Sequence, residues 1–156
     1  MGAGGNSGDE YEPSPWNWVR EQVQAFEASG GTEANTLAGT EYPIIVVTTR
    51  GAKTGKLRKT PLMRVEHGGG YALVASMGGA PKNPVWYANV RTHPDEVMVQ
   101  DGAERFAVEI RELAGSERDE WWQRAVAAYP PYADYQRNTE RRIPVLLATP
   151  RRPRGR

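Results

Sequence analysis

The sequence predicts one β-rich α+β domain, in which six mostly antiparallel strands close into a small barrel and helices are inserted between them. Three observations support this fold class. The 156 residues are the length of one ordinary domain with a single core. The 17 glycines and 12 prolines indicate many turns. Short apolar or alternating runs follow one another through glycine turns, and hairpin connections of this kind require antiparallel pairing.

The first 35 residues are expected to be a flexible tail followed by one short helix. Residues 1–13 are glycine-rich and then acidic, with no apolar stretch to bury. Residues 16–28 predict a helix that ends at the glycines 30–31, because apolar side chains recur at helical spacing. These side chains are Trp16, Val19, Val23 and Phe26.

Residues 36–150 are expected to form the barrel, and the basic residues 151–156 a frayed tail. The first strand contains the continuous apolar run 44–47, which indicates burial on both of its faces. Glycine turns at 68–70 and 101–102 predict two hairpins. The predicted strands are residues 42–50, 58–66, 71–76, 96–100, 104–113 and 143–149.

A second helix is predicted from residue 84 to about residue 91. Asn83 and Pro84 have the character of an N-cap and a first helical residue. The helix should stop before His93 and Pro94, because the residue before a proline disfavours the helical conformation.

A third helix is predicted to begin at Ser116, which forms a capping pattern with Asp119. Two consecutive prolines, 130 and 131, should break this helix. A further helical turn or two is then expected to carry Tyr132 and Tyr135.

The composition excludes several classes of site. The chain has no cysteine, which rules out disulfides, thiolate metal sites, iron–sulfur clusters and a cysteine nucleophile. His67 and His93 lie next to turn residues and are too few for most zinc sites, so no metal is expected. The longest apolar runs, 44–47 and 145–148, are too short for a membrane span, and no secretory signal is recognisable. A cytoplasmic protein is expected.

A local excess of positive charge marks the turn after the first strand. Five cations and no acid occur between residues 50 and 59, although the whole chain has a net charge of only +1. They are Arg50, Lys53, Lys56, Arg58 and Lys59. With Gly51 and Gly55, these side chains suit a multiply charged anion. A solvated hairpin tip that keeps a sheet edge soluble explains the same residues equally well.

A second glycine-rich turn connects the third strand to the helix at residue 84. Gly78 and Gly79 permit close approach of a flat ring or a phosphate, and the helix N-terminus attracts anions. An ordinary strand–helix connection is the simpler reading of this segment alone. Two glycine-rich turns that carry cations nevertheless favour a cofactor cleft.

Tyr129, Tyr132 and Tyr135 recur every three residues across the proline pair. Phenols suit a pocket for a flat, oxygen-bearing substrate, but simple helix packing accounts for the spacing as well. No Ser-His-Asp arrangement can be argued, so the reactive group is expected to come from a cofactor.

Three motifs resemble a known family. They are Gly51-Ala-Lys-Thr-Gly-Lys-x-Arg58-x-Thr60-Pro61-Leu62, Ala75-Ser76-x-Gly78-Gly79-Ala80-Pro81-Lys82-Asn83-Pro84-x-Trp86-x-x-Asn89, and Trp121-Trp122 with Tyr132-x-x-Tyr135. In this order they resemble the deazaflavin (F420)-dependent nitroreductase family of actinobacteria, of the mycobacterial nitroimidazole-activating quinone reductase type. The resemblance implies a split β-barrel like that of FMN-binding oxidoreductases. It also implies coenzyme F420, an 8-hydroxy-5-deazaflavin with a phospholactyl-oligoglutamate tail, and no metal. The implied reaction is hydride transfer from the reduced deazaflavin to a quinone or a nitroaromatic acceptor.

The resemblance also implies roles for individual residues. The phosphate and glutamyl tail would be held by Ala52, Lys53, Thr54, Arg58, Lys59, Thr60, Pro61, Leu62 and Met63. The deazaflavin ring would be lined by Val74, Ala75, Ser76, Met77, Val85, Trp86, Tyr87, Ala88 and Asn89, with Tyr132 closing over it. Lys56 and Gly78 are also expected to bind the cofactor. The substrate would face Ser76, Tyr129, Tyr132 and Tyr135 as the catalytic residues.

The expected partner is a small molecule and not a nucleic acid, for a chain that is a monomer or a homodimer. Trp16, Trp18 and Phe26 suit either a cover over the substrate or a peripheral contact with a membrane. Two alternatives stay open. One is an FMN-dependent oxidoreductase on the same barrel, and the other is a non-catalytic protein that binds F420 without turnover. A single-stranded nucleic-acid binder is disfavoured, because the cations lie in one loop and not along a track.

Overall fold

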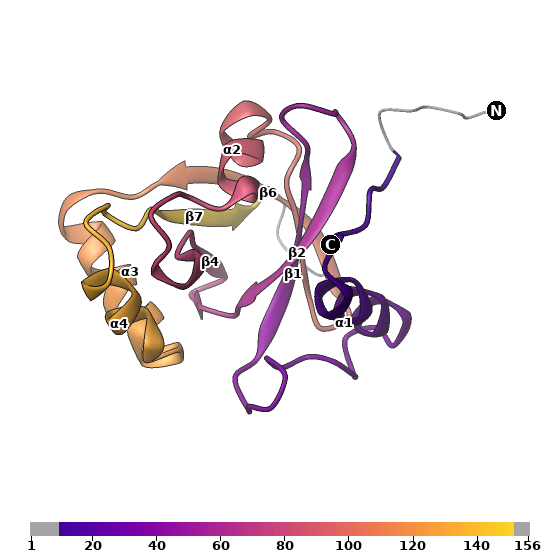
Figure 1. The fold of residues 1–156 in the computed structure, drawn as a ribbon, viewed down its shortest axis with the longest axis horizontal. Helices are drawn as coiled ribbons and strands as arrows, with labels where there is room; N and C mark the ends of the chain where they lie inside the picture. Colours follow the sequence, from indigo (N-terminus) through magenta and orange to yellow (C-terminus); the bar gives the residue numbers. More distant parts are fainter. Residues whose placement is uncertain (1–9, 152–156) are drawn as a thin grey trace.

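The computed structural model of the chain describes residues 10–151, which form a seven-stranded sheet with helices packed around it (Figure 1). The outer parts of the two expected tails, residues 1–9 and 152–156, lie outside the described residues. The strands are β1 (Ile44–Arg50), β2 (Leu57–Met63), β3 (Glu66–His67), β4 (Gly70–Val74), β5 (Met98–Asp101), β6 (Glu104–Glu112) and β7 (Val145–Pro150). The helices are α1 (Asn17–Ala28), α2 (Val85–Thr92), α3 (Gly115–Ala128) and α4 (Pro131–Arg137), with a 3-10 turn, η2 (Met77–Gly79).

The prediction of six strands is wrong, because the second predicted strand divides in two. β2 pairs with β1 as far as Met63, and the short β3 then pairs with β4. Between them the backbone changes partner: the Arg64 N–H donates to Pro43 O at 2.9 Å, and Val65 O accepts from the Ala72 N–H at 2.9 Å. The pattern of residues 58–66 carries no mark of this change of partner, since both halves are extended.

The sheet curls until its two ends are close together. Its strand order is β2-β1-β5-β6-β7-β4-β3, so that β2 and β3 stand at opposite ends although they follow each other in the chain. β6 connects the two halves, because its first residues pair with β5 and residues 108–112 pair with β7. Ile45 of β1 and Leu73 of β4 accordingly belong to one buried cluster, which also includes Trp86 and Val90 of α2. The fold is a curled antiparallel half-barrel closed around this core.

β1 confirms the predicted burial on both faces. All four residues of its apolar run are at most 3% exposed. Ile44 and Val46 pack against Val23 and Phe26 of α1, and the alternate residues of β1 face the barrel core. Figure 1 shows α1 beside β1 and β2, with α3 and α4 on the far side of the sheet near β4.

Two predicted helix caps are wrong. α3 begins at Gly115, whose φ of 62° turns the chain into the helix, and Ala114 occupies the N-cap without a side-chain hydrogen bond. Ser116 therefore lies inside the helix. Pro84 and not Asn83 is the N-cap of α2, since the Asn83 Oδ1 accepts a hydrogen bond from Arg141 instead. The break at the proline pair is confirmed, with α4 carrying the two later tyrosines. None of the helices in residues 10–151 is long and apolar enough to cross a membrane.

Candidate functional site

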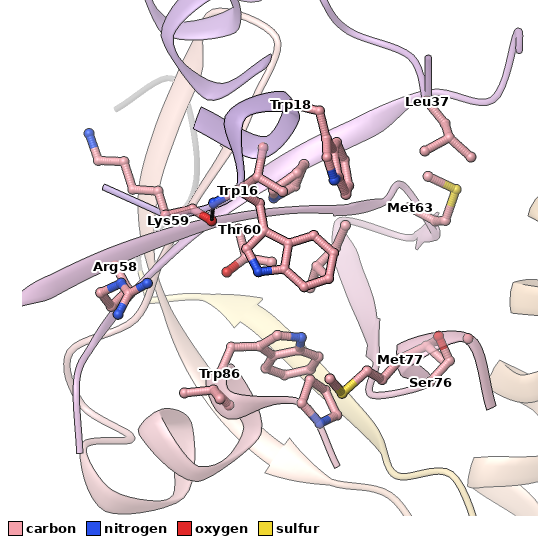
Figure 2. A pocket seen from close by; sticks show the side chains of 18 of the residues that line it. Trp16, Trp18, Leu37, Arg58, Lys59, Thr60, Met63, Ser76, Met77 and Trp86 are labelled. Atoms are coloured by element: carbon pink, nitrogen blue, oxygen red, sulfur yellow. Dashed lines mark hydrogen bonds between the residues drawn. The ribbon is translucent and has the colours of Figure 1, made fainter. Parts of the chain in front are cut away.

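A cavity of about 550 Å³ opens between two walls of the fold. In Figure 2, Trp16, Trp18 and Thr60 lie on the side of α1 and β2, and Trp86, Ser76 and Met77 lie across from them. Many of the predicted site residues line this cavity. They are Arg58, Lys59, Thr60, Pro61, Leu62, Met63, Val74, Ser76, Met77, Gly78, Val85, Trp86, Asn89, Tyr129, Tyr132 and Tyr135.

Other predicted site residues lie away from this wall. Ala52, Lys53, Thr54 and Lys56 belong to the loop between β1 and β2. Ala75 is fully buried and Ala88 is exposed. The Tyr87 hydroxyl donates to Glu112 Oε1 at 2.6 Å, which turns this side chain away from the cavity.

The cavity also has a wall that the residue-by-residue assignment omitted, formed by Ser14, Trp16, Trp18, Val19, Leu37 and Pro84. Trp16 is 62% exposed and Trp18 is 50% exposed. Two indoles that remain this exposed at the start of a helix are unusual, since such large apolar side chains normally contribute to a core. The sequence analysis named Trp16 and Trp18 as a cover over the substrate or a membrane contact. Only the fold shows that they face Trp86 (Figure 2).

Arg58 points toward the cavity because of its register in the sheet. It pairs with Thr49 across β1, and cross-strand partners lie on the same face. The hydroxyl of Thr49 accepts a hydrogen bond from Asn89 of α2, so this face is the cavity side. The next residue, Lys59, lies on the opposite face of β2, where it also borders the cavity and forms an ion pair with Glu27 of α1, with 2.6 Å between Nζ and Oε2.

The cations of the β1–β2 region have acidic neighbours from distant segments. Arg50 pairs with Glu96 at 2.7 Å, and the Lys56 Nζ lies 3.5 Å from an oxygen of Glu10. The Arg58 Nη1 lies 3.6 Å from Glu12 Oε1. Lys53 is exposed and makes no ion pair within residues 10–151. The positive charge is therefore partly compensated, most loosely at Lys53, Lys56 and Arg58.

Asn89 fixes the loop that carries these cations. Its Nδ2 donates to Thr49 Oγ1 at 3.2 Å, and its Oδ1 accepts from the Ala52 N–H at 2.9 Å. Asn89 and Thr49 are both buried, at 3% and 0% exposure. The amide side chain therefore joins α2 to the start of the loop, and a buried amide that is hydrogen-bonded at both its nitrogen and its oxygen holds its neighbours firmly.

The three tyrosines form one aromatic cluster at the cavity. The rings of Tyr129 and Tyr132 meet edge to face with their centroids 5.0 Å apart, and the hydroxyls of Tyr129 and Tyr135 are 3.1 Å apart. Burial, reinforced by the Tyr135 hydroxyl, raises the pKa of Tyr129 to about 12. Burial also raises the pKa of Tyr132. These phenols therefore keep their protons at neutral pH.

Two polar hydrogens at the cavity have no protein acceptor. Tyr132 is 4% exposed and Ser76 is 8% exposed, and both line the cavity. Neither hydroxyl forms a hydrogen bond with any of the residues 10–151. Among the described residues, only Glu12 Oε1 is a fully buried side-chain polar atom without a partner, so these two hydroxyls remain accessible at the cavity and can serve a ligand. Within the same residues, no group of three or more His, Asp or Glu side chains could hold a metal ion.

Residues 18–150 match the sequence profile of a family described as F420H(2)-dependent quinone reductase. The chain is 37% identical over 112 residues to an F420H(2)-dependent quinone reductase of Mycobacterium tuberculosis, covering 70% of this chain and 74% of that protein. It is 35% identical over 109 residues to a putative F420H(2)-dependent quinone reductase of the same organism, covering 70% and 91%.

Two solved structures are also similar. One is an F420-H2 dependent reductase called FDR-A, with a TM-score of 0.64, 56% identity and coverage of 68% of this chain and 93% of that one. The other is described as a domain-swapped dimer, with a TM-score of 0.67, 51% identity and coverage of 86% and 99%.

Proposed function

Because this chain belongs to the F420H(2)-dependent quinone reductase family, it is an F420H2-dependent oxidoreductase, and we propose that it reduces a quinone or a nitroaromatic acceptor in the cavity beside Tyr132. The observation that carries this proposal is the Tyr132 hydroxyl. It makes no hydrogen bond in the described chain, and it belongs to a residue that is 4% exposed at the wall of a cavity large enough for a ligand.

The residues of the cavity fit coenzyme F420. A flat ring needs an apolar slot, and Trp86 and Met77 provide one wall of it opposite Trp16 (Figure 2). An anionic tail needs donors and positive charge at one end, where Arg58 and Thr60 lie. A Cβ at Gly78 would meet no protein atom within 4 Å, so the turn leaves room for a ligand.

We assign the tail to Arg58 and Thr60, with Lys53 continuing the positive charge beyond the cavity. The ring is assigned to the walls at Ser76, Met77 and Trp86. Asn89 holds the cationic loop in place through Ala52.

Reduced F420, when bound, supplies a hydride, which carries both electrons of the reduction. The protein holds the acceptor in line and excludes water, which is the main contribution expected of residues such as Trp86. The Tyr132 and Ser76 hydroxyls are positioned to donate hydrogen bonds to an acceptor oxygen as negative charge develops there. The acceptor also needs one proton, which we assign to solvent, because burial raises the pKa of Tyr132 and leaves its phenol a hydrogen-bond donor but a poor acid.

Three further proposals concern architecture and surroundings. We propose that the curled half-barrel is the split β-barrel of the flavin-binding oxidoreductases, since strands from both ends of the sheet share one core. We also propose a homodimer, which the domain-swapped dimer at 51% identity supports. The exposed Trp16 and Trp18 are the side chains proposed for any peripheral membrane contact, whereas the expectation for Phe26 is wrong because it is fully buried against β1.

The direct test is spectroscopic. Purified protein is mixed with reduced F420 and menadione, and the absorbance of the oxidised deazaflavin is followed. We expect that absorbance to return faster than without enzyme. A rate equal to the uncatalysed control would contradict the reductase, and tight F420 binding without turnover would indicate a carrier. A protein that is yellow as purified, and whose FMN displaces F420, would indicate the FMN-dependent alternative.

The Glu12→Gln variant is expected to bind F420 about two- to fivefold more tightly, because Glu12 competes with the anionic tail for Arg58. Glu12 Oε1 is buried but accepts no hydrogen bond in the described chain, so its hold on Arg58 is weak. Fluorescence titration of F420 at low salt measures the change, and Glu21→Gln on the exposed face of α1 is the control. Weaker binding by Glu12→Gln would show that Glu12 supports the site.

Ionisation of the Tyr129 phenol is expected to cause no loss of turnover below about pH 10. The pKa of Tyr129 rises from its ordinary 10.0 to about 12 on folding, so the folded state keeps this proton longer than the unfolded state does. The stability that this proton provides is therefore complete below pH 10 and is lost as the pH rises from 10 to 12. Phenolate absorbance during an alkaline titration measures the shift, with Tyr129→Phe as the control. A phenol that titrates at its ordinary value in the wild type and is missing from Tyr129→Phe would contradict the prediction.

A further inference from the structure

The turn that carries Ser76 and Met77 has an unfavourable backbone. Met77 has a φ of 46°, a left-handed conformation that side chains other than glycine rarely adopt. Gly78 and Gly79 follow at 64° and 83°, and Ala80 returns to an extended conformation. Such a turn persists only where its surroundings hold it. Its position is important because Ser76, Met77 and Gly78 form one wall of the cavity.

The guanidinium of Arg141 binds this turn on both sides. Its donors reach Ala75 O at 3.1 Å, Ser76 O at 2.7 Å, Ala80 O at 2.7 Å and Asn83 Oδ1 at 2.8 Å. The acceptors precede, begin and follow the strained segment. Four of the five N–H groups of one planar side chain are used, on a segment almost 60 or more residues away in the chain.

Every one of these partners is neutral. Arg141 makes no ion pair within residues 10–151, whereas the arginines of the cationic loop have carboxylates nearby. Burial lowers the pKa of Arg141, in keeping with a charge that only carbonyl and amide oxygens compensate. Arg141 therefore contributes a planar set of N–H donors and does not pair with a carboxylate of the described chain.

The opposite side of the turn rests on α4. A Cβ at Gly79 would lie 2.7 Å from Tyr135 O, so only glycine allows the two backbones to approach this closely. The turn is therefore held between Arg141 and the helix that carries Tyr132 and Tyr135. This arrangement sets the hydroxyl of Ser76 and the phenols of α4 at the same cavity.

We propose that Arg141 is a positioning residue of the active site, whose guanidinium holds the turn around Met77 so that Ser76 and Met77 face the bound ligands. Its consequence for turnover rests on the proposed function, whereas its hold on the turn does not. Lysine cannot replace it, because a single ammonium group cannot reach carbonyls on both sides of a turn in one plane. Arg141 acts through the turn and touches no reacting atom.

The test uses Arg141→Lys and Arg141→Gln, with Arg142→Gln as the control. Arg142 is the exposed neighbour and makes no hydrogen bond within the described chain. Hydrogen exchange is measured first, without any ligand, at the amides of Gly79 and Ala80, which donate to Ser76 O and Met77 O. We expect both Arg141 variants to exchange about tenfold faster there and at the wild-type rate in β1, and the control to be unchanged.

Binding and turnover complete the test. We expect kcat to fall about tenfold or more in both Arg141 variants, because the donors of the acceptor site are displaced. The Kd for F420 is expected to change less than about threefold, because Arg58 is untouched.

Four outcomes would overturn the proposal. They are unchanged exchange at Gly79 and Ala80, faster exchange throughout the sheet, the same acceleration in Arg142→Gln, and an unaltered kcat in active variants with a loosened turn. If the wild type itself neither binds F420 nor turns over, the proposed function fails. Exchange in the ligand-free protein then still decides whether Arg141 holds the turn.

Discussion

Replacing Tyr132 with phenylalanine is expected to lower kcat by about 10²-fold and to leave the free energy of unfolding unchanged or slightly higher. The hydroxyl of Tyr132 makes no hydrogen bond with any of the residues 10–151, so its removal breaks no hydrogen bond among them. The ring stays in its contacts with Tyr129 and Trp122. Only the hydrogen bond offered to the acceptor is lost. Steady-state kinetics with reduced F420 and a quinone measure the first effect, and chemical denaturation measures the second.

Tyr87→Phe is the matched control, with the opposite expected result. The hydroxyl of Tyr87 donates to Glu112 and lies away from the cavity. Its loss should cost about 1 kcal/mol of stability, with kcat unchanged. If Tyr132→Phe keeps full activity, the ring of Tyr132 only packs, and the hydrogen bond to the acceptor must come from another group.

Lys53→Ala combined with Arg58→Ala is expected to raise the Kd for F420 by about 10²-fold while the fold is retained. Arg58 lines the cavity and Lys53 is exposed in the adjoining loop, and neither contributes to a buried cluster. Titration of F420 fluorescence at two salt concentrations measures the effect. The wild type should lose more affinity with salt than the double variant does, because fewer charges contact the tail in the variant.

Arg111→Ala is the control for the double variant, since Arg111 is an exposed cation of β6 that pairs with Glu117. Affinity unchanged in the double variant would mean that the tail lies elsewhere. Combining Arg58→Ala with Glu12→Gln closes a double-mutant cycle. The gain from Glu12→Gln should vanish when Arg58 is absent, because the two side chains then no longer interact.

Strand and helix segments with strong local patterns were predictable from the sequence, whereas the helix caps and the change of strand partner were not. The apolar run of β1 and the proline pair before α4 have local patterns that correctly predicted a strand and a helix break. The exchange of partner at Arg64 and Val65 has no local pattern, because extended residues look alike whichever strand they pair with.

The same distinction applies to the site. The cations of residues 50–59 were visible in the sequence, but their acidic neighbours Glu10, Glu12 and Glu96 come from other segments. The spacing of the three tyrosines suggested a pocket, and the fold brings them to its wall. Arg141 stood out in no motif, because its acceptors are mainly backbone carbonyls almost 60 or more residues earlier.

The short connection between β2 and β3 limits how far the two ends of the sheet can separate. Arg64 and Val65 are the only residues between the two ends of the sheet, and two extended residues span about 7 Å. β2 and β3 therefore cannot move far apart unless β2 loses its pairing with β1 or β3 loses its pairing with β4. We expect the passage for incoming and outgoing molecules to lie instead beneath the two exposed indoles of the N-terminal helix region, whose displacement disturbs no strand pairing.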